Sequence, residues 1–265
     1  MSRPAGDEPK KASVVALVRG LRVLQCFDRP GAELTVSEIA RRTGLSQPTA
    51  WRLCGTLIDC GFLVKAPTGS ALRVGAPALT LGYAAIQGQD LPAIARPYMA
   101  QVAARMGATV TLGLSTGLDI VSVDQVDGDF VVANRPVGWR APMTSIPSGL
   151  AILAVMPEFE REQILASIAT QDPEAWPRRR DRIETARAQL EADGYVSLVM
   201  MRGQYAAVSV PLIEGDTSRG RYWTLSCGGL QSQWPPEALT DAARQLKDIR
   251  ALIQPAAAIL GATAA

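Results

Sequence analysis

Side chains that can contact nucleic acid are concentrated in one short segment of the sequence. Gln47, Thr49 and Arg52 lie close together, and amide, hydroxyl and guanidinium groups are those that read base edges in the major groove of DNA. Trp51 lies between them and either shares this surface or packs against neighbouring structure. Basic side chains that can bind backbone phosphates flank the segment: Arg41, Arg42, Lys65 and Arg73. The pattern predicts a surface that contacts a DNA duplex.

Catalytic and metal-binding residue types are sparse. The chain has no histidine, and its four cysteines form no Cys-x-x-Cys pair, so we interpret them as reduced thiols without metal or disulfide. No spacing typical of a catalytic pair or a phosphate-binding loop is present. We therefore expect a protein that is not an enzyme and needs no cofactor. The alternative is a small-acid-binding enzyme with an N-terminal protein-interaction module, in which Cys227 would supply thiol chemistry.

A second candidate site lies at a predicted helix start in the C-terminal half. Pro147 or Ser148 caps a helix whose first backbone amides, at residues 149–151, have no partners within the helix. Such a helix end attracts an anion, for example a carboxylate, without any charged side chain. The sequence therefore predicts an anion-binding site at this helix start.

Apolar periodicity and capping residues predict the helices that position the first site. Apolar residues spaced by three and four predict a helix over residues 14–27. Thr35 and Glu38 form a capping box at the start of a second helix, which Gly44 ends. Ser46, a favoured N-cap residue, begins the third helix.

The second and third of these helices form a helix-turn-helix, because a glycine turn joins them and the outer face of the third is small or polar. Two short strands follow at 62–65 and 71–74, around a tight turn, and predict a wing. Winged helices also serve as protein–protein modules, so DNA binding is one of two interpretations of the motif itself. The charge favours DNA. Residues 1–75 carry 11 basic and 6 acidic side chains (+5), and the other 190 carry 16 and 19 (−3).

Composition and length indicate two domains. The chain has 265 residues, of which 48% are hydrophobic and 20% charged, as in soluble globular proteins. No run approaches the roughly 20 apolar residues that span a bilayer, so we expect a cytoplasmic protein without membrane contact. We expect the following divisions: a disordered leader at 1–12, the winged helix-turn-helix at 13–76, a linker helix at 77–90 and an effector-binding domain at 91–262.

The linker helix is either a lever between the domains or an ordinary packed connector. Its apolar side chains Leu79, Leu81, Tyr83 and Ile86 are candidate contacts in a dimer. Beyond it, two groups of strands around helices predict an α+β domain with a mostly antiparallel sheet. The strands are expected at 109–115, 118–126, 130–135, 195–199, 205–213 and 221–227. The helices are expected at 91–106, 149–155, 158–169, 180–193 and 236–260.

At these motifs the sequence resembles the IclR family of bacterial transcriptional regulators. Residues 34–46 are similar to the family's helix-turn-helix, and 72–75 (Leu-Arg-Val-Gly) resemble its wing-closing Tyr-Arg-Leu-Gly. Residues 138–154 resemble its Gly-x-Arg-x-Pro-Leu-His followed by Ser-Gly-Lys-Ala-x-Leu-Ala, with Thr144 in place of histidine and Leu150 in place of lysine or arginine. Residues 206–212 and 224–229 resemble its pocket strands.

The resemblance implies a GAF-like effector-binding domain, a homodimer or tetramer on a double-stranded DNA operator, and an organic or aromatic carboxylate as effector. The alternative for the small residues of the pocket is that they only allow close packing. The predicted DNA-binding residues are Thr35, Arg41, Arg42, Ser46, Gln47, Thr49, Trp51, Arg52, Lys65 and Arg73. The effector-binding residues that the resemblance implies are Met143, Thr144, Ser148, Gly149, Ser209, Pro211, Ser226 and Cys227.

Overall fold

The chain forms two compact units, Met1–Gln87 and Gly88–Ala265. The computed structural model describes residues 14–29, 31–67, 69–87, 90–129, 136–215 and 221–263. The expected leader and the expected strand at 130–135 lie outside these residues. The helix expected as a linker belongs to the first unit.

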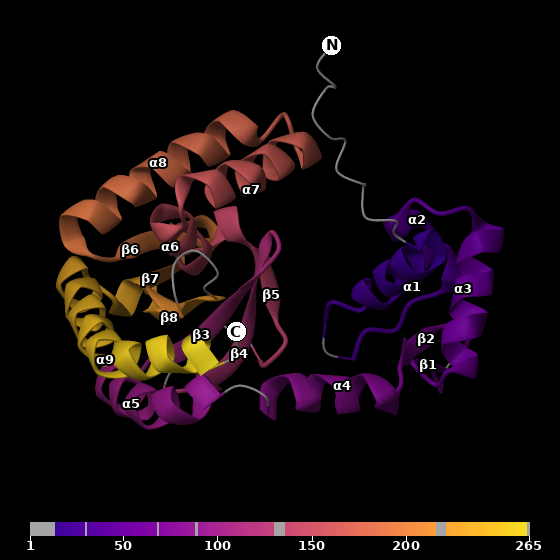
Figure 1. Cartoon of the computed structure of the whole chain (residues 1–265), viewed down its shortest axis with the longest axis horizontal. Helices are drawn as coiled ribbons and strands as arrows, with labels where there is room; N and C mark the ends of the chain where they lie inside the picture. Colours follow the sequence, from indigo (N-terminus) through magenta and orange to yellow (C-terminus); the bar gives the residue numbers. More distant parts are fainter. Residues whose placement is uncertain are drawn as a thin grey trace, which may run out of the picture. The chain divides into compact units, whose positions relative to one another are not determined.

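The first unit has the predicted helix-turn-helix and wing (Figure 1). Its elements in chain order are α1 (Val15–Gln25), α2 (Val36–Thr43), α3 (Gln47–Asp59), β1 (Leu63–Lys65), β2 (Leu72–Val74) and α4 (Ala76–Gln87). Every element from α1 to β2, and the segment before α2, contributes side chains to one small core. Its buried members are Val23, Leu34, Ile39, Cys54, Leu63 and Leu72.

Helix α2 begins and ends as the sequence predicts. The Thr35 hydroxyl accepts a hydrogen bond from the Glu38 amide (3.3 Å), and the Glu38 carboxylate accepts one from the Thr35 amide (2.8 Å). The Thr35 amide and hydroxyl both donate to the Glu38 carboxylate, and these two bonds lower its pKa. Gly44 ends the helix in the left-handed conformation (φ 68°). The capping box is confirmed.

Helix α3 begins where the sequence predicts. Ser46 occupies the N-cap position, although its hydroxyl makes no hydrogen bond to a backbone amide of the helix. The hydroxyl lies 2.8 Å from the Thr49 hydroxyl instead. The predicted N-cap position of Ser46 is confirmed, and its side chain pairs with Thr49.

The wing is closed by close backbone packing. Strands β1 and β2 pair antiparallel, and Leu34 bridges to Leu72 as a short third member. The Gly75 amide donates to the Phe62 carbonyl (2.8 Å). A Cβ at Gly75 would lie 1.9 Å from the Gly61 carbonyl oxygen, so a larger residue would not fit. The Leu-Arg-Val-Gly segment needs its glycine for this contact.

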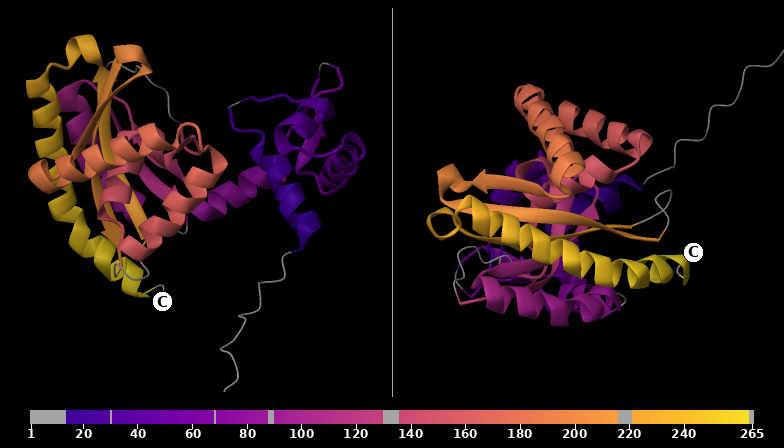
Figure 2. Two further views of the ribbon diagram at one scale, coloured as in Figure 1. Left: turned by 90° about the horizontal axis from the view of Figure 1, so that it is seen from above. Right: turned by 90° about the vertical axis from the view of Figure 1, so that its left-hand side faces the viewer.

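The second unit is a sheet with helices on both faces, as the α+β prediction requires (Figures 1 and 2). Its elements are α5 (Asp90–Met106), β3 (Thr109–Thr116), β4 (Asp119–Val126), β5 (Arg140–Pro142), the 3₁₀ turn η1 (Met143–Ser145), α6 (Pro147–Val155), α7 (Glu158–Gln171), α8 (Trp176–Asp193), β6 (Val196–Met200), β7 (Tyr205–Glu214), β8 (Arg221–Leu230) and α9 (Pro236–Thr263). The described strands form one six-stranded sheet in the order β5-β4-β3-β8-β7-β6, and all of their pairings are antiparallel.

Each face of the sheet has its own core. Helices α5 and α9 cover one face, where Met99 and Leu246 pack with Trp223. Helices α6 and α8 cover the other, where Leu150 and Ile183 are buried. Because successive side chains of a strand point to opposite faces, β8 contributes Trp223 to the first core and Tyr222 to the second.

Two elements depart from the predicted boundaries. Helix α8 begins at Trp176, four residues before the expected start, and the short strand β5 lies where none was expected. Strand β5 has only three residues and pairs with residues 119–121 of β4, so a local pattern gives little sign of it. None of the helices in the described part of the chain is both long and apolar enough to cross a membrane.

Candidate functional site

Helix α3 presents a polar and aromatic face that no other described element covers. Ala50 and Cys54 are buried against the unit's core. Trp51 is 69% exposed, so it lies on the outer face of the helix and is not packed under the wing. Arg52 is exposed beside it, and within the described ranges nothing pairs with its guanidinium. Trp51 and Arg52 are thus available for a ligand as large as a duplex.

Two predicted DNA contacts have partners inside the protein. The Gln47 amide donates to the Ser37 hydroxyl (2.7 Å), which ties α3 to the start of α2. Arg42 donates to the Cys26 carbonyl (3.0 Å) and forms an ion pair with Asp28 (3.6 Å). These contacts hold the helices in place. We therefore assign Gln47 and Arg42 a role in positioning the helices.

The other basic side chains predicted to bind phosphates are exposed around this face. Arg41 lies in the last turn of α2. Lys65 and Arg73 lie on neighbouring strands of the wing, where Lys65 is opposite Leu72 and Arg73 is opposite Val64. Their exposure is compatible with the predicted phosphate contacts, which stay a prediction.

The second unit encloses a small cavity between its sheet and the N-terminal turn of α6. Its volume is about 10 Å³, close to the least that holds one water molecule. Most of its lining is hydroxyl-bearing or apolar, and no charged side chain is part of it. The lining residues are Thr111, Gly113, Ile120, Ser122, Trp139, Ile146, Ser148, Thr224 and Ser226.

Two of the predicted effector-binding residues, Ser148 and Ser226, line this cavity. Ser209 lies directly opposite Ser226 on β7, and their hydroxyls form a very short hydrogen bond. Pro211 lies opposite Thr224 on the same strand. These two β7 residues therefore flank the cavity wall without being part of its lining.

The remaining predicted pocket residues support the cavity from behind. Met143 and Thr144 are buried in η1, and Arg182 of α8 donates to the Thr144 carbonyl (3.2 Å). A Cβ at Gly149 would lie 2.2 Å from the Met143 carbonyl oxygen. Gly149 is thus required so that α6 and η1 can touch, which places the first turn of α6 at the cavity.

Cys227 is not a pocket residue, and that expectation is wrong. Strand alternation places it on the opposite face from Ser226, in the core formed with α5 and α9. Burial raises the pKa of its thiol to about 12. Thiol chemistry at this position, the basis of the enzyme alternative, therefore lacks both access and a thiolate.

Iodoacetamide at about pH 8 is expected to leave Cys227 unmodified in the folded protein, because the thiolate is the reacting form. Cys60 is exposed and serves as the internal control. Peptide mass spectrometry measures both sites in one sample. Equal rates of alkylation at the two cysteines would contradict the burial of Cys227.

Most of the cavity lining was not predicted from the sequence. It comes from four strand or helix elements and the segments beside them, and no single motif contains it. One signal was available: small or hydroxyl-bearing residues alternate with large apolar ones at Thr111 and Gly113 in β3, and at Thr224 and Ser226 in β8. Two neighbouring strands with this pattern indicate a shared polar face.

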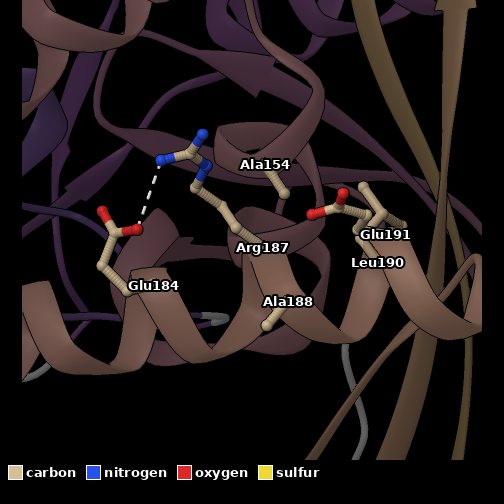
Figure 3. A pocket seen from close by; sticks show the side chains of 6 residues that line it. All are labelled: Ala154, Glu184, Arg187, Ala188, Leu190 and Glu191. Atoms are coloured by element: carbon tan, nitrogen blue, oxygen red, sulfur yellow. Dashed lines mark hydrogen bonds and ion pairs between the residues drawn. The ribbon is translucent and has the colours of Figure 1, made fainter.

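A wider hollow of about 420 Å³ lies on the surface between α6 and α8. Figure 3 shows Arg187 paired with Glu184 on one side of it, and Glu191 near Ala154 on the other. This hollow is open and lined by exposed charges that are already paired or solvated. The candidate ligand site is therefore the smaller buried cavity. The described residues contain no group of three or more Cys, Asp and Glu that could hold a metal ion.

A winged helix-turn-helix with an exposed reading face, in one chain with a sheet domain that encloses a hydroxyl-lined cavity, defines the class of DNA-binding transcriptional regulators. Two family models match the chain. The IclR helix-turn-helix domain matches residues 16–67, and the bacterial transcriptional regulator IclR C-terminal domain matches residues 83–174. The chain belongs to the IclR family, and it is a regulator and not an enzyme.

Similar proteins agree with this assignment. The HTH-type transcriptional regulator TsaQ1/TsaQ2 of Comamonas testosteroni is 33% identical over 69% of this chain and 66% of its own length. The transcriptional repressor IclR of Escherichia coli (strain K12) is 27% identical over 59% of this chain and 58% of its own. The chain thus spans about two thirds or less of the length of these relatives.

Solved structures extend the likeness to the whole fold. The crystal structure of an IclR family transcriptional regulator from Brucella abortus is 32% identical, covers 96% of both chains and has a TM-score of 0.82. An IclR homolog complexed with 4-hydroxybenzoate, from Microbacterium hydrocarbonoxydans, is 24% identical over 89% of this chain and 99% of its own, with a TM-score of 0.62. The latter shows the fold alone.

Proposed function

We propose that this chain is a cytoplasmic, sequence-specific regulator whose binding to a double-stranded DNA operator is modulated by a small organic or aromatic carboxylate. The observation that carries the proposal is the outer face of α3, where Trp51 and Arg52 are exposed and unengaged. A tryptophan that is 69% exposed, next to an arginine without an ion-pair partner, is unusual on a helix that binds nothing. A major groove accommodates such a helix, and arginine reads guanine in it.

The chemistry of the cavity supports a carboxylate as effector. Ser148 lies in the first turn of α6, where backbone amides and the helix dipole favour an anion. Ile120, Ile146 and Trp139 supply an apolar wall for a ring or a short hydrocarbon, but the volume of about 10 Å³ holds only one water, so the lining must move apart to admit such a ligand. The 4-hydroxybenzoate complex of a protein with the same fold is consistent with an aromatic acid.

Exposed apolar helix faces support a second copy of the chain as partner. On α1 and just before it, Val14, Leu17 and Leu21 are at least half exposed and share one face at helical spacing. On α4, Leu79 is 76% and Tyr83 64% exposed. A homodimer, or a dimer of dimers, would cover these faces and place two winged helices on successive major grooves of a partly palindromic operator.

Effector binding acts on DNA binding only if the ligand prefers one arrangement of the reading heads. A coupling free energy of about 1–3 kcal/mol is usual for such a switch. The ligand then changes the operator affinity by about fivefold to 150-fold, and the operator changes the ligand affinity by the same factor.

A mobility-shift titration of the full chain on DNA from its own upstream region tests the proposal. Affinity is expected to fall about 1,000-fold or more between 50 and 200 mM salt, because released counterions supply much of the binding free energy. Benzoate and 4-hydroxybenzoate are the first effectors to add, with a thermal-shift measurement on the free protein in parallel.

Specific retention of the upstream fragment over an unrelated fragment of equal length, changed by a carboxylate, would support the proposal. Failure to retain the upstream fragment at low salt, with and without the carboxylates, would overturn it. If the fragment is retained but carboxylates have no effect, the DNA-binding part of the proposal stands and carboxylates are ruled out as effectors.

A further inference from the structure

The side chain of the first residue of α3 is held by a residue of α2. Gln47 Nε2 donates to the Ser37 hydroxyl (2.7 Å), and both side chains are exposed. Within the described residues, Gln47 Oε1 has no hydrogen-bond partner. We infer that Ser37 orients the Gln47 amide so that it reads an adenine in the major groove. This inference rests on the proposed function, in which α3 binds an operator.

The position of Gln47 is suited to contact with a base. In proteins that bind DNA through a helix-turn-helix, the N-terminal residues of the second helix contact base edges. Gln47 is the N-terminal residue of α3, and its side chain is exposed, whereas Ala50 and Cys54 of the same helix are buried. The amide group therefore lies on the side of α3 that is open to a duplex.

The groups left free on the amide match one base. A primary amide has one acceptor oxygen and two N–H donors, and the bond to Ser37 uses one of these donors. An acceptor and a donor remain side by side. Adenine presents the complementary pair on its major-groove edge, the N6 donor and the N7 acceptor, whereas guanine presents two acceptors there. Gln47 therefore forms a paired contact with adenine and with no other base.

The bond to Ser37 also fixes the order of donor and acceptor. The oxygen and nitrogen ends of an amide have nearly the same shape, so a half turn of the group exchanges them. With the two ends exchanged, Nε2 would face the exocyclic group of the base, where guanine and thymine offer an oxygen. Because Ser37 holds Nε2, this exchange is prevented, and Oε1 is left to accept from the N6 amino group of adenine.

Ser37 also reduces the entropy that this long side chain loses on binding. A glutamine that is free at a surface loses rotamer freedom when it binds a base, and this loss weakens binding. Gln47 is already held in the free protein. The hydroxyls nearest in sequence, Ser46 and Thr49, pair with each other (2.8 Å), so in the described part of the chain Ser37 is the residue that orients Gln47. Ser37 is thus a positioning residue, and Gln47 is the residue that touches the base.

Selection of bound duplexes from a random-sequence pool, followed by sequencing, gives the base preference of the full chain at each position. The same selection with Gln47→Ala identifies the position that Gln47 reads, because the preference is lost there and kept elsewhere. Titration of duplexes that differ only at this base pair then gives the discrimination as a ratio of affinities. Melting temperatures show that each variant is folded.

The wild type is expected to prefer adenine at this position by about tenfold to 100-fold over the other bases. Ser37→Ala is expected to reduce this ratio by about fivefold or more, because the amide is free to turn over. The preferences at the other positions are expected to stay unchanged. Ser37→Thr keeps the hydroxyl and is expected to keep most of the ratio.

Thr56→Ala is the matched control. It removes another exposed hydroxyl of α3, which donates to the Arg52 carbonyl (3.2 Å) and does not touch Gln47. This variant is expected to leave the ratio unchanged. An equal loss in Thr56→Ala and Ser37→Ala would overturn the inference, because the effect would then come from a general change in α3.

A preference for any base other than adenine at the position identified by Gln47→Ala would also overturn the inference. So would an unchanged ratio in Ser37→Ala, because Ser37 would then only tie the two helices together. If Gln47→Ala alters no position of a site that the wild type enriches, Gln47 reads no base, and the inference fails while the proposed function stands. If the wild type enriches no sequence, the proposed sequence-specific function fails, and the inference fails with it.

Discussion

Replacing Arg52 with alanine is expected to lower the preference of the protein for its operator over unrelated DNA by about tenfold to 100-fold, without changing the melting temperature. The guanidinium is exposed on α3, and nothing in the described part of the chain pairs with it. Its removal therefore breaks no internal contact. What is lost is the ability to form a paired hydrogen bond with a guanine edge, which is the usual source of discrimination by arginine.

Arg41→Ala is the matched control, because Arg41 is also exposed and lies in the last turn of α2. As a phosphate contact it is expected to weaken operator and unrelated DNA alike, and to reduce the slope of log affinity against log salt by about one. Competition mobility-shift assays measure both quantities. If Arg52→Ala weakened both DNAs equally, as Arg41→Ala should, Arg52 would be a phosphate contact and the base-reading role would be wrong.

Gly149→Ala is expected to destabilise the second unit by about 3 kcal/mol and to abolish effector binding. The added Cβ would lie 2.2 Å from the Met143 carbonyl oxygen and 2.3 Å from its Cα. Because both are backbone atoms, no side-chain rotation relieves the clash. Helix α6 and η1 must move apart, which displaces Ser148 from the cavity. Urea unfolding followed by near-ultraviolet circular dichroism gives the free energy of unfolding.

Gly20→Ala is the control for this substitution. Gly20 lies within α1, and a Cβ there has no atom within 4 Å. Alanine is expected to stabilise that helix by about 0.5–1 kcal/mol, because it reduces the freedom of the unfolded chain. Equal stability of Gly149→Ala and the wild type would contradict the close backbone contact between α6 and η1.

The N-terminal unit could be predicted nearly in full because its signals are local. The capping box at Thr35, the left-handed Gly44 and the apolar spacing of α1 and α3 each act within a few residues. What could not be predicted is which polar side chains the tertiary structure engages. Gln47 and Arg42 bond to groups on other elements. Nothing in the local sequence distinguishes them from polar residues whose side chains are free at the surface.

The cavity could be predicted only in part because it is assembled from distant segments. The helix start at Ser148 was a local signal and is part of the lining. Thr224 is brought there by strand pairing with Gly113, more than 100 residues earlier in the sequence, which no local pattern encodes. The error at Cys227 was avoidable, since it follows Ser226 in a strand and must face the other way.

The close packing at the end of the wing determines how a rotation of α4 is transmitted to α3. The Gly75 amide donates to the Phe62 carbonyl, Gly75 fits against the Gly61 backbone, and a Cβ on Gly61 would lie 3.4 Å from Pro77 of α4. These contacts connect the first turn of α4 to the residues directly after α3, with no flexible hinge between them. A rotation of α4 is therefore expected to move α3 with it. Because Arg52 lies on α3, a rotation of even a few degrees would change where its side chain meets the DNA.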